Sequence, residues 1–232
     1  MQDLQPTGAP ALADLGHVVA IVPVRGLERA KTRLGEALDP EERRVLVEGL
    51  LRRTIRAAIM TPGILAVAVV SPDPEALAVA ADSGAVTLPQ GGGGLNEGLA
   101  DGRSWAREVG ATALVVVPAD LPAIEPAELE RVLIAARDWL AASRGAGTPE
   151  RALVALVPDR AGEGTNLLLL SPPGAIPFRF GPGSRAAHAA AATSLGAAYL
   201  ELRGPLGLDL DTPDDLLDAE TAGLGGAVIE AP

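Results

Sequence analysis

Three aspartates have the residue type and spacing expected of ligands for a divalent cation. Asp120 follows an apolar, strand-like run that ends at Pro118, which has no backbone N–H to donate. Asp209 and Asp211 are two residues apart, so in an extended segment their side chains point the same way. Mg2+ prefers oxygen ligands such as carboxylates. The pattern predicts a magnesium site, unless Asp120 only caps a turn and Asp211 only caps the helix that follows it.

Three cations, Arg25, Lys31 and Arg33, follow the first apolar run. Loops in this position receive phosphates in many α/β proteins. Lysine occurs only at position 31 among the 19 basic residues, which suggests a place that requires a compact ammonium group. The chain has neither a Gly-x-x-x-x-Gly-Lys-Ser/Thr nor a Gly-x-Gly-x-x-Gly motif, so a P-loop ATPase and a dinucleotide enzyme are disfavoured. The cations predict a phosphate-binding loop, although a solvated basic turn would have the same composition.

A run of four glycines, 91–94, precedes a segment with helical character. Glycine backbone lets an anion approach closely, and the N-terminus of a helix favours negative charge. Asn96 lies where its amide could bond a hydroxyl group or the edge of a base. This stretch therefore predicts a nucleotide-binding loop, and the alternative is a flexible tether.

Two further turns combine glycine with a small hydroxyl residue. Thr165 follows Gly164, and Ser184 follows Gly183. Their hydroxyl and backbone N–H groups suit a carboxylate or a phosphate. His188, on an alanine-rich segment of helical character, is interpreted as a structural residue.

Segments typical of strands and of helices alternate along the chain that must position these residues. Apolar runs predict strands at 17–24, 64–71, 85–88, 114–117, 152–157, 167–170 and 199–202. Helical spacing and helix-start residues predict helices at 39–60, 74–83, 95–109, 125–141 and around His188, and a short strand turning into a last helix within 207–216. This alternation predicts an α/β fold with a mostly parallel sheet and helices on both faces.

One domain is predicted for residues 17–220. Residues 1–16 are rich in Pro, Gly and Ala and are interpreted as a flexible leader, and residues 221–232 as a C-terminal tail. The stretch 142–150 is interpreted as an exposed loop rather than a linker, because the alternation of strand and helix resumes on both sides of it.

The composition excludes several functional classes. A net charge of -11 and only 2% aromatic residues argue against binding a nucleic-acid backbone or stacking on single-stranded bases. No apolar run approaches the ~18 residues needed to span a bilayer, and the N-terminus lacks a secretory signal, so a soluble, cytoplasmic protein is expected. The absence of cysteine excludes disulfides and thiolate chemistry.

Taken together, the motifs resemble one known family. They are, in order, Pro23-Val24-Arg25, 30–34 (Ala-Lys-Thr-Arg-Leu), Gly94-Leu95-Asn96, 118–122 (Pro-Ala-Asp-Leu-Pro), Pro158-Asp159-Arg160, Gly164-Thr165-Asn166, 180–184 (Phe-Gly-Pro-Gly-Ser) with His188, and 208–213 (Leu-Asp-Leu-Asp-Thr-Pro). The sequence resembles the 2-phospho-L-lactate/phosphoenolpyruvate guanylyltransferases of deazaflavin coenzyme F-420 biosynthesis over about residues 17–217. The resemblance implies the nucleotide-diphospho-sugar transferase fold, which is Rossmann-like and shared with molybdenum-cofactor guanylyltransferases. Arg25, where many relatives carry lysine, and Arg185, which is often a bulky residue, depart from the family pattern.

The resemblance implies transfer of GMP from GTP to the phosphate of a three-carbon phospho-acid, with release of pyrophosphate. The attacking phosphate is already ionised near pH 7, since its second pKa is ~6 by analogy with phospho-amino acids. No general base is therefore required, which agrees with a chain that has two histidines and no cysteine. The difficulty is to bring two anions together, and cations and in-line positioning meet it.

The resemblance also implies roles for individual residues. Catalytic roles fall to Lys31, Arg33 and Asp120, nucleotide contacts to Pro23, Val24, Arg25, Gly94 and Asn96, acceptor contacts to Thr165, Gly183 and Ser184, and Mg2+ ligation to Asp120, Asp209 and Asp211. The implied partners are GTP, a small phospho-acid, and a downstream transferase that receives an unstable product.

Other functions are open at this point. One is a sugar-phosphate nucleotidyltransferase or glycosyltransferase of the same fold, because Asp-x-Asp also serves sugar nucleotides. Another is a catalytically silent GTP-binding regulator. The acceptor is open among phosphoenolpyruvate, 2-phospho-L-lactate and 3-phosphoglycerate, because a difference of one small group often shifts specificity by only ~1–3 kcal/mol. The oligomeric state is open as well.

Overall fold

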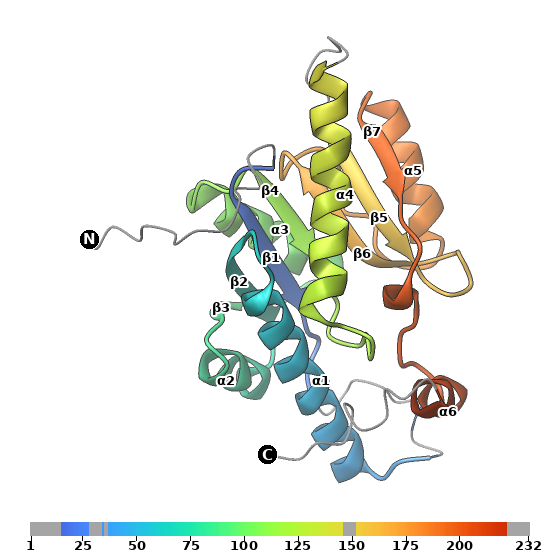
Figure 1. Cartoon of the computed structure of the whole chain (residues 1–232). Helices are drawn as coiled ribbons and strands as arrows, with labels where there is room; N and C mark the ends of the chain where they lie inside the picture. Colours follow the sequence, from blue (N-terminus) through green and yellow to red (C-terminus); the bar gives the residue numbers. More distant parts are fainter. Residues whose placement is uncertain (1–14, 28–33, 35–36, 146–151, 222–232) are drawn as a thin grey trace.

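The computed structural model describes residues 15–27, 34, 37–145 and 152–221, and its centre is one sheet of seven strands (Figure 1). The strands are β1 (Val18–Pro23), β2 (Ile64–Ser71), β3 (Val86–Pro89), β4 (Ala113–Val116), β5 (Leu153–Pro158), β6 (Thr165–Ser171) and β7 (Ala198–Glu201). The helices are α1 (Pro40–Met60), α2 (Pro74–Asp82), α3 (Leu95–Glu108), α4 (Pro126–Gly145), α5 (Ser184–Ser194) and α6 (Pro213–Thr221), with a 3-10 turn, η2, at Pro205–Gly207. The predicted alternation is therefore confirmed.

The order of the strands is β3-β2-β1-β4-β6-β5-β7. Every pairing is parallel except those that β6 makes with β4 and β5. The predicted mostly parallel sheet is therefore confirmed, with one reversed strand. Because β6 runs the opposite way, its first residue, Thr165, lies at the same edge as the carboxyl ends of the other strands. That edge brings together residues from both halves of the chain.

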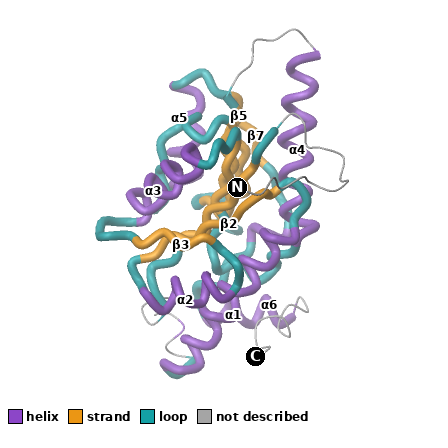
Figure 2. Tube along the Cα trace, turned by 90° about the vertical axis from the view of Figure 1, so that its left-hand side faces the viewer, coloured by secondary structure: helices purple, strands orange, loops and turns teal. Residues whose placement is uncertain are grey.

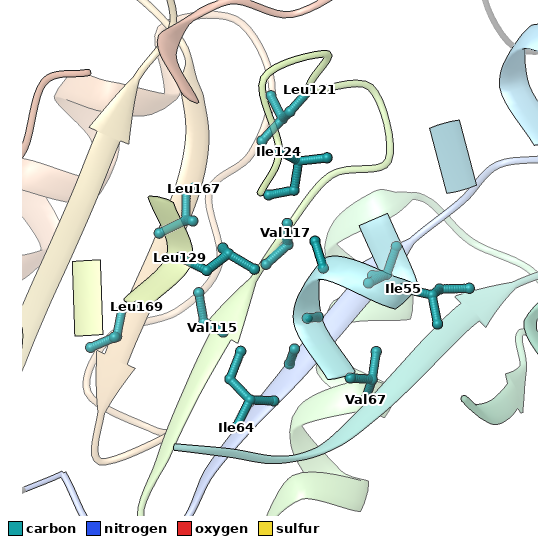
Figure 3. Close-up of a cluster of buried hydrophobic side chains, with 14 of the residues drawn as sticks. Ile55, Ile64, Val67, Val115, Val117, Leu121, Ile124, Leu129, Leu167 and Leu169 are labelled. Atoms are coloured by element: carbon teal, nitrogen blue, oxygen red, sulfur yellow. The ribbon is translucent and has the colours of Figure 1, made fainter. Parts of the chain in front are cut away.

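The two faces of the sheet carry separate hydrophobic cores. One core lies under α1, α2 and α4, and the other under α3 and α5, and Figure 2 shows these helices on opposite sides of the sheet. Neighbouring residues of a strand serve different cores: Val115 belongs to the first and Val116 to the second, as the two-residue period of a strand requires. Figure 3 shows part of the first core, where Val115, Val117 and Leu129 lie close together.

The longest helix, α1, begins where the sequence predicts. The Asp39 side chain accepts hydrogen bonds from the backbone N–H groups of Glu41 and Glu42, and the Glu42 side chain accepts from Asp39 N. This capping box satisfies backbone donors that have no partner within the helix. A third cluster, which includes Leu46 and Leu50, packs α6 against α1.

Three details differ from the sequence prediction. No strand forms at 207–211: after η2 the chain is extended but lies outside the sheet, because its backbone pairs with a loop through the bond from Leu210 N to Asp120 O (3.0 Å). Helix α4 continues through residues expected to begin a loop, to Gly145. Leu15, expected in a flexible leader, is buried, and its carbonyl accepts a hydrogen bond from Thr112 Oγ1 at 2.6 Å.

None of the helices in the described ranges is both long enough and apolar enough to cross a bilayer. The rest of the predicted leader, the remainder of the 142–150 stretch and the tail after Thr221 lie outside the described residues.

Candidate active site

A cavity of about 380 Å³ lies at the carboxyl ends of β1 and β2. Its lining residues are Pro23, Val24, Arg25, Val70, Pro72, Gln90, Gly93, Gly94, Leu95 and Gly98. Four of the five residues predicted to contact a nucleotide are among them, and the fifth, Asn96, is not. The cavity sits where ligands bind in open α/β sheets, outside the carboxyl ends of the strands.

Gln90 organises the glycine loop beside this cavity. Its Nε2 group donates to the carbonyls of Gly92 and Gly94, both at 2.9 Å. Its amide oxygen lies against Gly98, where a Cβ atom would come within 2.7 Å of it. Gly98 therefore makes room for the side chain that holds the loop. Gly92 and Gly94 are thus held by Gln90, and the nucleotide-binding role of the loop stays a prediction.

Asp73 fixes the start of the loop that carries the predicted phosphate-binding cations. One carboxylate oxygen accepts from Leu27 N at 2.8 Å, and the other accepts from Glu75 N at 2.9 Å, at the start of α2. Arg25 is exposed and borders the cavity. Lys31 and Arg33 lie outside the described residues, so their roles stay predictions.

The two segments that carry the predicted metal ligands lie side by side. Leu210 N donates to Asp120 O, and Leu210 is fully buried, whereas its neighbours Asp209 and Asp211 are half-buried. Asn166 Nδ2 approaches Asp209 Oδ1 at 3.3 Å, which links the acidic segment to the start of β6. Asp120 and the Asp209–Asp211 pair, which are far apart in the sequence, therefore belong to one region of the fold.

Whether these carboxylates suit Mg2+ can be judged from their chemistry and surroundings. They offer oxygen ligands, as a hard cation requires. The cap of α6 is made by Thr212, whose hydroxyl and N–H bond with Asp215, so Asp211 is not needed as the cap. Within the described ranges, however, no three His, Cys, Asp or Glu side chains gather as a metal-binding group. The carboxylate oxygens fit Mg2+ as ligands, and the binding of Mg2+ by Asp120, Asp209 and Asp211 together stays a prediction.

A buried network of hydroxyl and imidazole groups lies at the amino end of β6. Ser184 Oγ bonds to Thr165 Oγ1 at 3.1 Å, and Thr165 Oγ1 bonds to His188 Nδ1, also at 3.1 Å. His188 Nε2 accepts a hydrogen bond from Arg179 N at 3.0 Å. Burial, together with the charge of Arg179, lowers the pKa of His188 to about 4. Two of the predicted acceptor-binding residues are thus bonded to each other, and one of them, Thr165, also bonds to a histidine interpreted from sequence as structural.

Gly183 forms the N-cap of α5 beside this network. Its φ of +69° is in the left-handed region that favours glycine. The backbone N–H groups of Ser184 and Arg185 donate to the carbonyls of Gly181 and Glu163, both at 3.1 Å. The N–H groups of Ser184 and Arg185 are therefore used within the protein, and Ser184 offers its hydroxyl group instead.

Asn96 connects the two parts of the site. Its Oδ1 accepts from Phe180 N at 2.9 Å, and its Nδ2 donates to Phe180 O at 3.0 Å. The first turn of α3, next to the glycine loop, is thereby tied to the loop before α5. The Phe180 ring in turn packs edge-on against the imidazole of His188, with centroids 5.0 Å apart. Asn96 acts here as a clamp between the two loops, and its contact with the nucleoside stays a prediction.

Sequence reasoning did not assign a role to Gln90, Asp73 or His188. Gln90 immediately precedes the glycine run, and Asp73-Pro74 has the pattern of a helix start, so a signal existed for these two residues. That Asp73 also holds Leu27, and that His188 faces Thr165, depends on contacts between residues 46 and 23 positions apart. No spacing rule along the chain would have shown those contacts.

Comparison with known proteins agrees with this architecture. The family model described as "Guanylyl transferase CofC like" matches residues 18–226. A phosphoenolpyruvate guanylyltransferase of Rubrobacter xylanophilus is 44% identical over 207 residues, which are 89% of this chain and 95% of that protein. A phosphoenolpyruvate guanylyltransferase of Sphaerobacter thermophilus is 46% identical over 199 residues, covering 85% and 90%.

Solved structures show the same fold at low sequence identity. A nucleotidyl transferase from Methanothermobacter thermautotroptrophicus superposes with a TM-score of 0.64 at 16% identity, covering 90% of this chain and 98% of the other. A 4-diphosphocytidyl-2C-methyl-D-erythritol synthase from Anaerococcus prevotii gives 0.59 at 9% identity, covering 92% and 99%. Since the family model spans most of the chain and the relatives exceed 40% identity over nearly their whole length, the chain belongs to the CofC-like family of guanylyl transferases.

Proposed function

We propose that this protein transfers GMP from GTP to the phosphate of phosphoenolpyruvate and releases pyrophosphate, as a step in deazaflavin coenzyme biosynthesis. The observation that carries the proposal is the arrangement at one edge of the sheet. A cavity bordered by Arg25 and the glycine loop lies at the end of β1, and the acidic segment bonds to Asp120 after the neighbouring parallel strand β4. The relatives at 44% and 46% identity are named phosphoenolpyruvate guanylyltransferases, which supports this acceptor over the other three-carbon phospho-acids.

The cavity at β1 and β2 suits the nucleotide. Its walls combine apolar side chains such as Val70 and Leu95 with backbone and amide groups of the glycine loop. Ligand cavities of this kind are mostly apolar, with a few polar groups that orient the ligand. The triphosphate would then lie toward Arg25, with Lys31 and Arg33 in the loop anchored by Asp73.

The corner at Thr165 and Ser184 suits the acceptor. Both side chains are buried and carry hydroxyl groups close to the acidic segment, which Asn166 connects to β6. Hydroxyl donors can bond the carboxylate of a phospho-acid while its phosphate faces the nucleotide. This placement would put acceptor and donor on either side of Asp120.

In the reaction, an oxygen of the acceptor phosphate attacks the α-phosphorus of GTP. The bond from the α-phosphorus to the bridging oxygen breaks, and pyrophosphate leaves with the electron pair. The acceptor phosphate is already ionised, so the residues of this chain need to bind and align two anions rather than move a proton. Asp120, Asp209 and Asp211 would hold Mg2+, which supplies positive charge between the two phosphates.

The test is pyrophosphate release by the full-length protein. GTP with Mg2+ is combined in turn with phosphoenolpyruvate, 2-phospho-L-lactate, 3-phosphoglycerate and glucose-1-phosphate, ATP is the control donor, and EDTA removes the metal. We expect pyrophosphate from GTP with phosphoenolpyruvate, little from ATP, and none with EDTA. Mass spectrometry of the product should give the mass of GMP joined to the acceptor through a new phosphoanhydride.

Each other outcome identifies a different function. Release only with 2-phospho-L-lactate or 3-phosphoglycerate would keep the guanylyltransferase and change its acceptor. Release only with glucose-1-phosphate would indicate a sugar-phosphate nucleotidyltransferase. GTP binding without release from any acceptor would indicate the catalytically silent regulator and overturn the proposal.

A further inference from the structure

We propose that His188 is a positioning residue that makes the Thr165–Ser184 pair a hydrogen-bond donor toward the acceptor substrate. The proposal rests on the function proposed above, because it assigns the pair to an anionic group of the phospho-acid. It concerns a side chain that lies beneath the substrate site and is fully buried.

The backbone contact of His188 determines which ring nitrogen carries the hydrogen. Arg179 N is a backbone amide, so it can only donate, and it lies 3.0 Å from His188 Nε2. His188 Nε2 must therefore carry a lone pair rather than a hydrogen. A neutral imidazole has one N–H, so the hydrogen is on Nδ1. The charged form of the ring, with a hydrogen on both nitrogens, is incompatible with this contact.

The position of this hydrogen determines the direction of the bond between His188 and Thr165. His188 Nδ1 carries the hydrogen, so it donates to Thr165 Oγ1 at 3.1 Å. Ser184 Oγ donates to the same oxygen, also at 3.1 Å. A hydroxyl oxygen has two lone pairs, and these two bonds use both of them. Thr165 can then interact with a ligand only by donating its own hydrogen.

The result does not depend on which hydroxyl group donates within the pair. Two hydroxyl groups carry two hydrogens, and the bond between Thr165 and Ser184 uses one of them. If Thr165 donates to Ser184 instead, the hydrogen of Ser184 remains. No other hydrogen bond of either side chain occurs in the described part of the chain. The pair thus keeps one hydrogen for an acceptor atom, such as a carboxylate or phosphate oxygen.

The surroundings hold the histidine in this state. Ser184 and His188 are one helical turn apart on α5, so both face the start of β6. The Phe180 ring packs edge-on against the imidazole at 5.0 Å, which limits rotation of the ring. Burial beside the positive Arg179 lowers the pKa of His188, in agreement with a neutral ring.

Two substitutions separate positioning from a merely structural role. In His188→Asn, the side-chain NH2 can occupy the place of Nδ1 and donate to Thr165. In His188→Gln, the amide reaches the place of Nε2 and can accept from Arg179 N, but the donor to Thr165 is lost. Both variants remove the ring and its contact with Phe180, so a purely structural role predicts similar losses for both.

We expect the KM for phosphoenolpyruvate to rise at least tenfold in His188→Gln and less than threefold in His188→Asn, with the KM for GTP unchanged in both. Thermal unfolding of each variant checks that the two are folded to the same extent. Equal changes in the KM for phosphoenolpyruvate, or equal changes for both substrates, would overturn the positioning role. If the parent enzyme releases no pyrophosphate with any acceptor, the proposed function itself fails, and this role fails with it.

A second measurement tests the network without turnover. Nitrogen-15 NMR of the imidazole rings distinguishes the Nδ1–H from the Nε2–H form, and the His188→Asn spectrum assigns the signal, since the chain has only two histidines. We expect His188 to be neutral at pH 7 with its hydrogen on Nδ1. A hydrogen on Nε2, or on both nitrogens, would overturn the inference even if the enzyme is active.

Discussion

The two halves of the candidate site, at β1–β2 and at β6, consist of different kinds of groups. On the β1–β2 side, the glycine loop and the Gln90 amide border a cavity whose other walls are mostly apolar side chains. On the β6 side, Thr165, Ser184 and His188 are buried and bonded in series. In the first half, glycines let a ligand come close to the backbone. In the second half, the bonds among buried polar side chains determine in which direction a hydrogen bond can point.

The difference shows how one sheet edge can bind two anions, each through its own set of residues. A glycine loop adapts its shape to a ligand, but it needs an external brace, which Gln90 provides. A buried network is rigid because an unsatisfied polar group in it would cost ~1–3 kcal/mol. Between the halves lie Asp120 and the clamp from Asn96 to Phe180. Changes on one side should therefore affect one substrate, and changes at these links should affect both.

The largest effect is expected at the link between the halves. Asp120→Asn removes one negative charge from the predicted Mg2+ site, and we expect kcat to fall by about 1,000-fold while the fold is retained. Pyrophosphate release and circular dichroism measure the two quantities. Asp138→Asn is the matched control, because Asp138 is exposed on α4 and pairs with its neighbour Arg137. Activity retained by Asp120→Asn at saturating Mg2+ would contradict its assignment as a main ligand.

The next effect concerns stability on the buried side. The folded pKa of His188, about 4, is below its usual value of 6.5, so the unfolded chain binds a proton between these pH values that the folded protein does not. This contribution to stability is complete above pH 6.5 and is lost as the pH falls toward 4, up to about 3 kcal/mol. Denaturant unfolding at pH 7, 6 and 5 should show a steeper loss for the parent than for His188→Asn. Equal slopes would mean that His188 titrates normally.

A smaller effect is expected on the glycine side. In Gly98→Ala the new Cβ would lie 2.7 Å from the Gln90 amide oxygen, so that flexible side chain must swing away and release Gly92 and Gly94. We expect the KM for GTP to rise about tenfold, with stability nearly unchanged because alanine favours a helix by ~1 kcal/mol. Steady-state kinetics with each substrate varied in turn measures the split.

Gly91→Ala is the matched control for that experiment. A Cβ at Gly91 meets no atom within 4 Å, and the position is outside the cavity lining. Its KM for GTP should stay close to that of the parent enzyme. An equal rise in both variants would mean that the whole run, rather than the support from Gln90, determines nucleotide binding.

The smallest effect is expected at the clamp. Asn96→Ala removes two hydrogen bonds to the Phe180 backbone, each contributing ~1 kcal/mol, and part of this is recovered by water. We expect the KM values for both substrates to rise by about fivefold, because the clamp joins the two loops. Ser104→Ala, on the exposed side of the same helix, should change neither. A rise for GTP alone would support the nucleoside contact predicted from sequence.

The fold was predictable from local patterns to a large extent. Buried runs gave the strands, and Asp39-Pro40 gave the start of α1, because burial on both faces and capping leave a mark on adjacent residues. The extended segment at 208–211 was expected as a strand and is not one. Its backbone bonds to Asp120 O instead of to a neighbouring strand. The residues of an extended segment do not by themselves determine which other segment it pairs with.

The sequence by itself determined which chemistry is possible: carboxylates after a strand, a glycine run before a helix and small hydroxyl turns, all recognisable from residue type and order. Only the tertiary structure decided how they are used. It bonded Asn96 to the backbone of Phe180, Gln90 to the carbonyls of the glycine loop, and His188 to Thr165. The reason is physical. The direction of a hydrogen bond depends on which atoms meet, and those atoms come from segments that the folding of the sheet brings together.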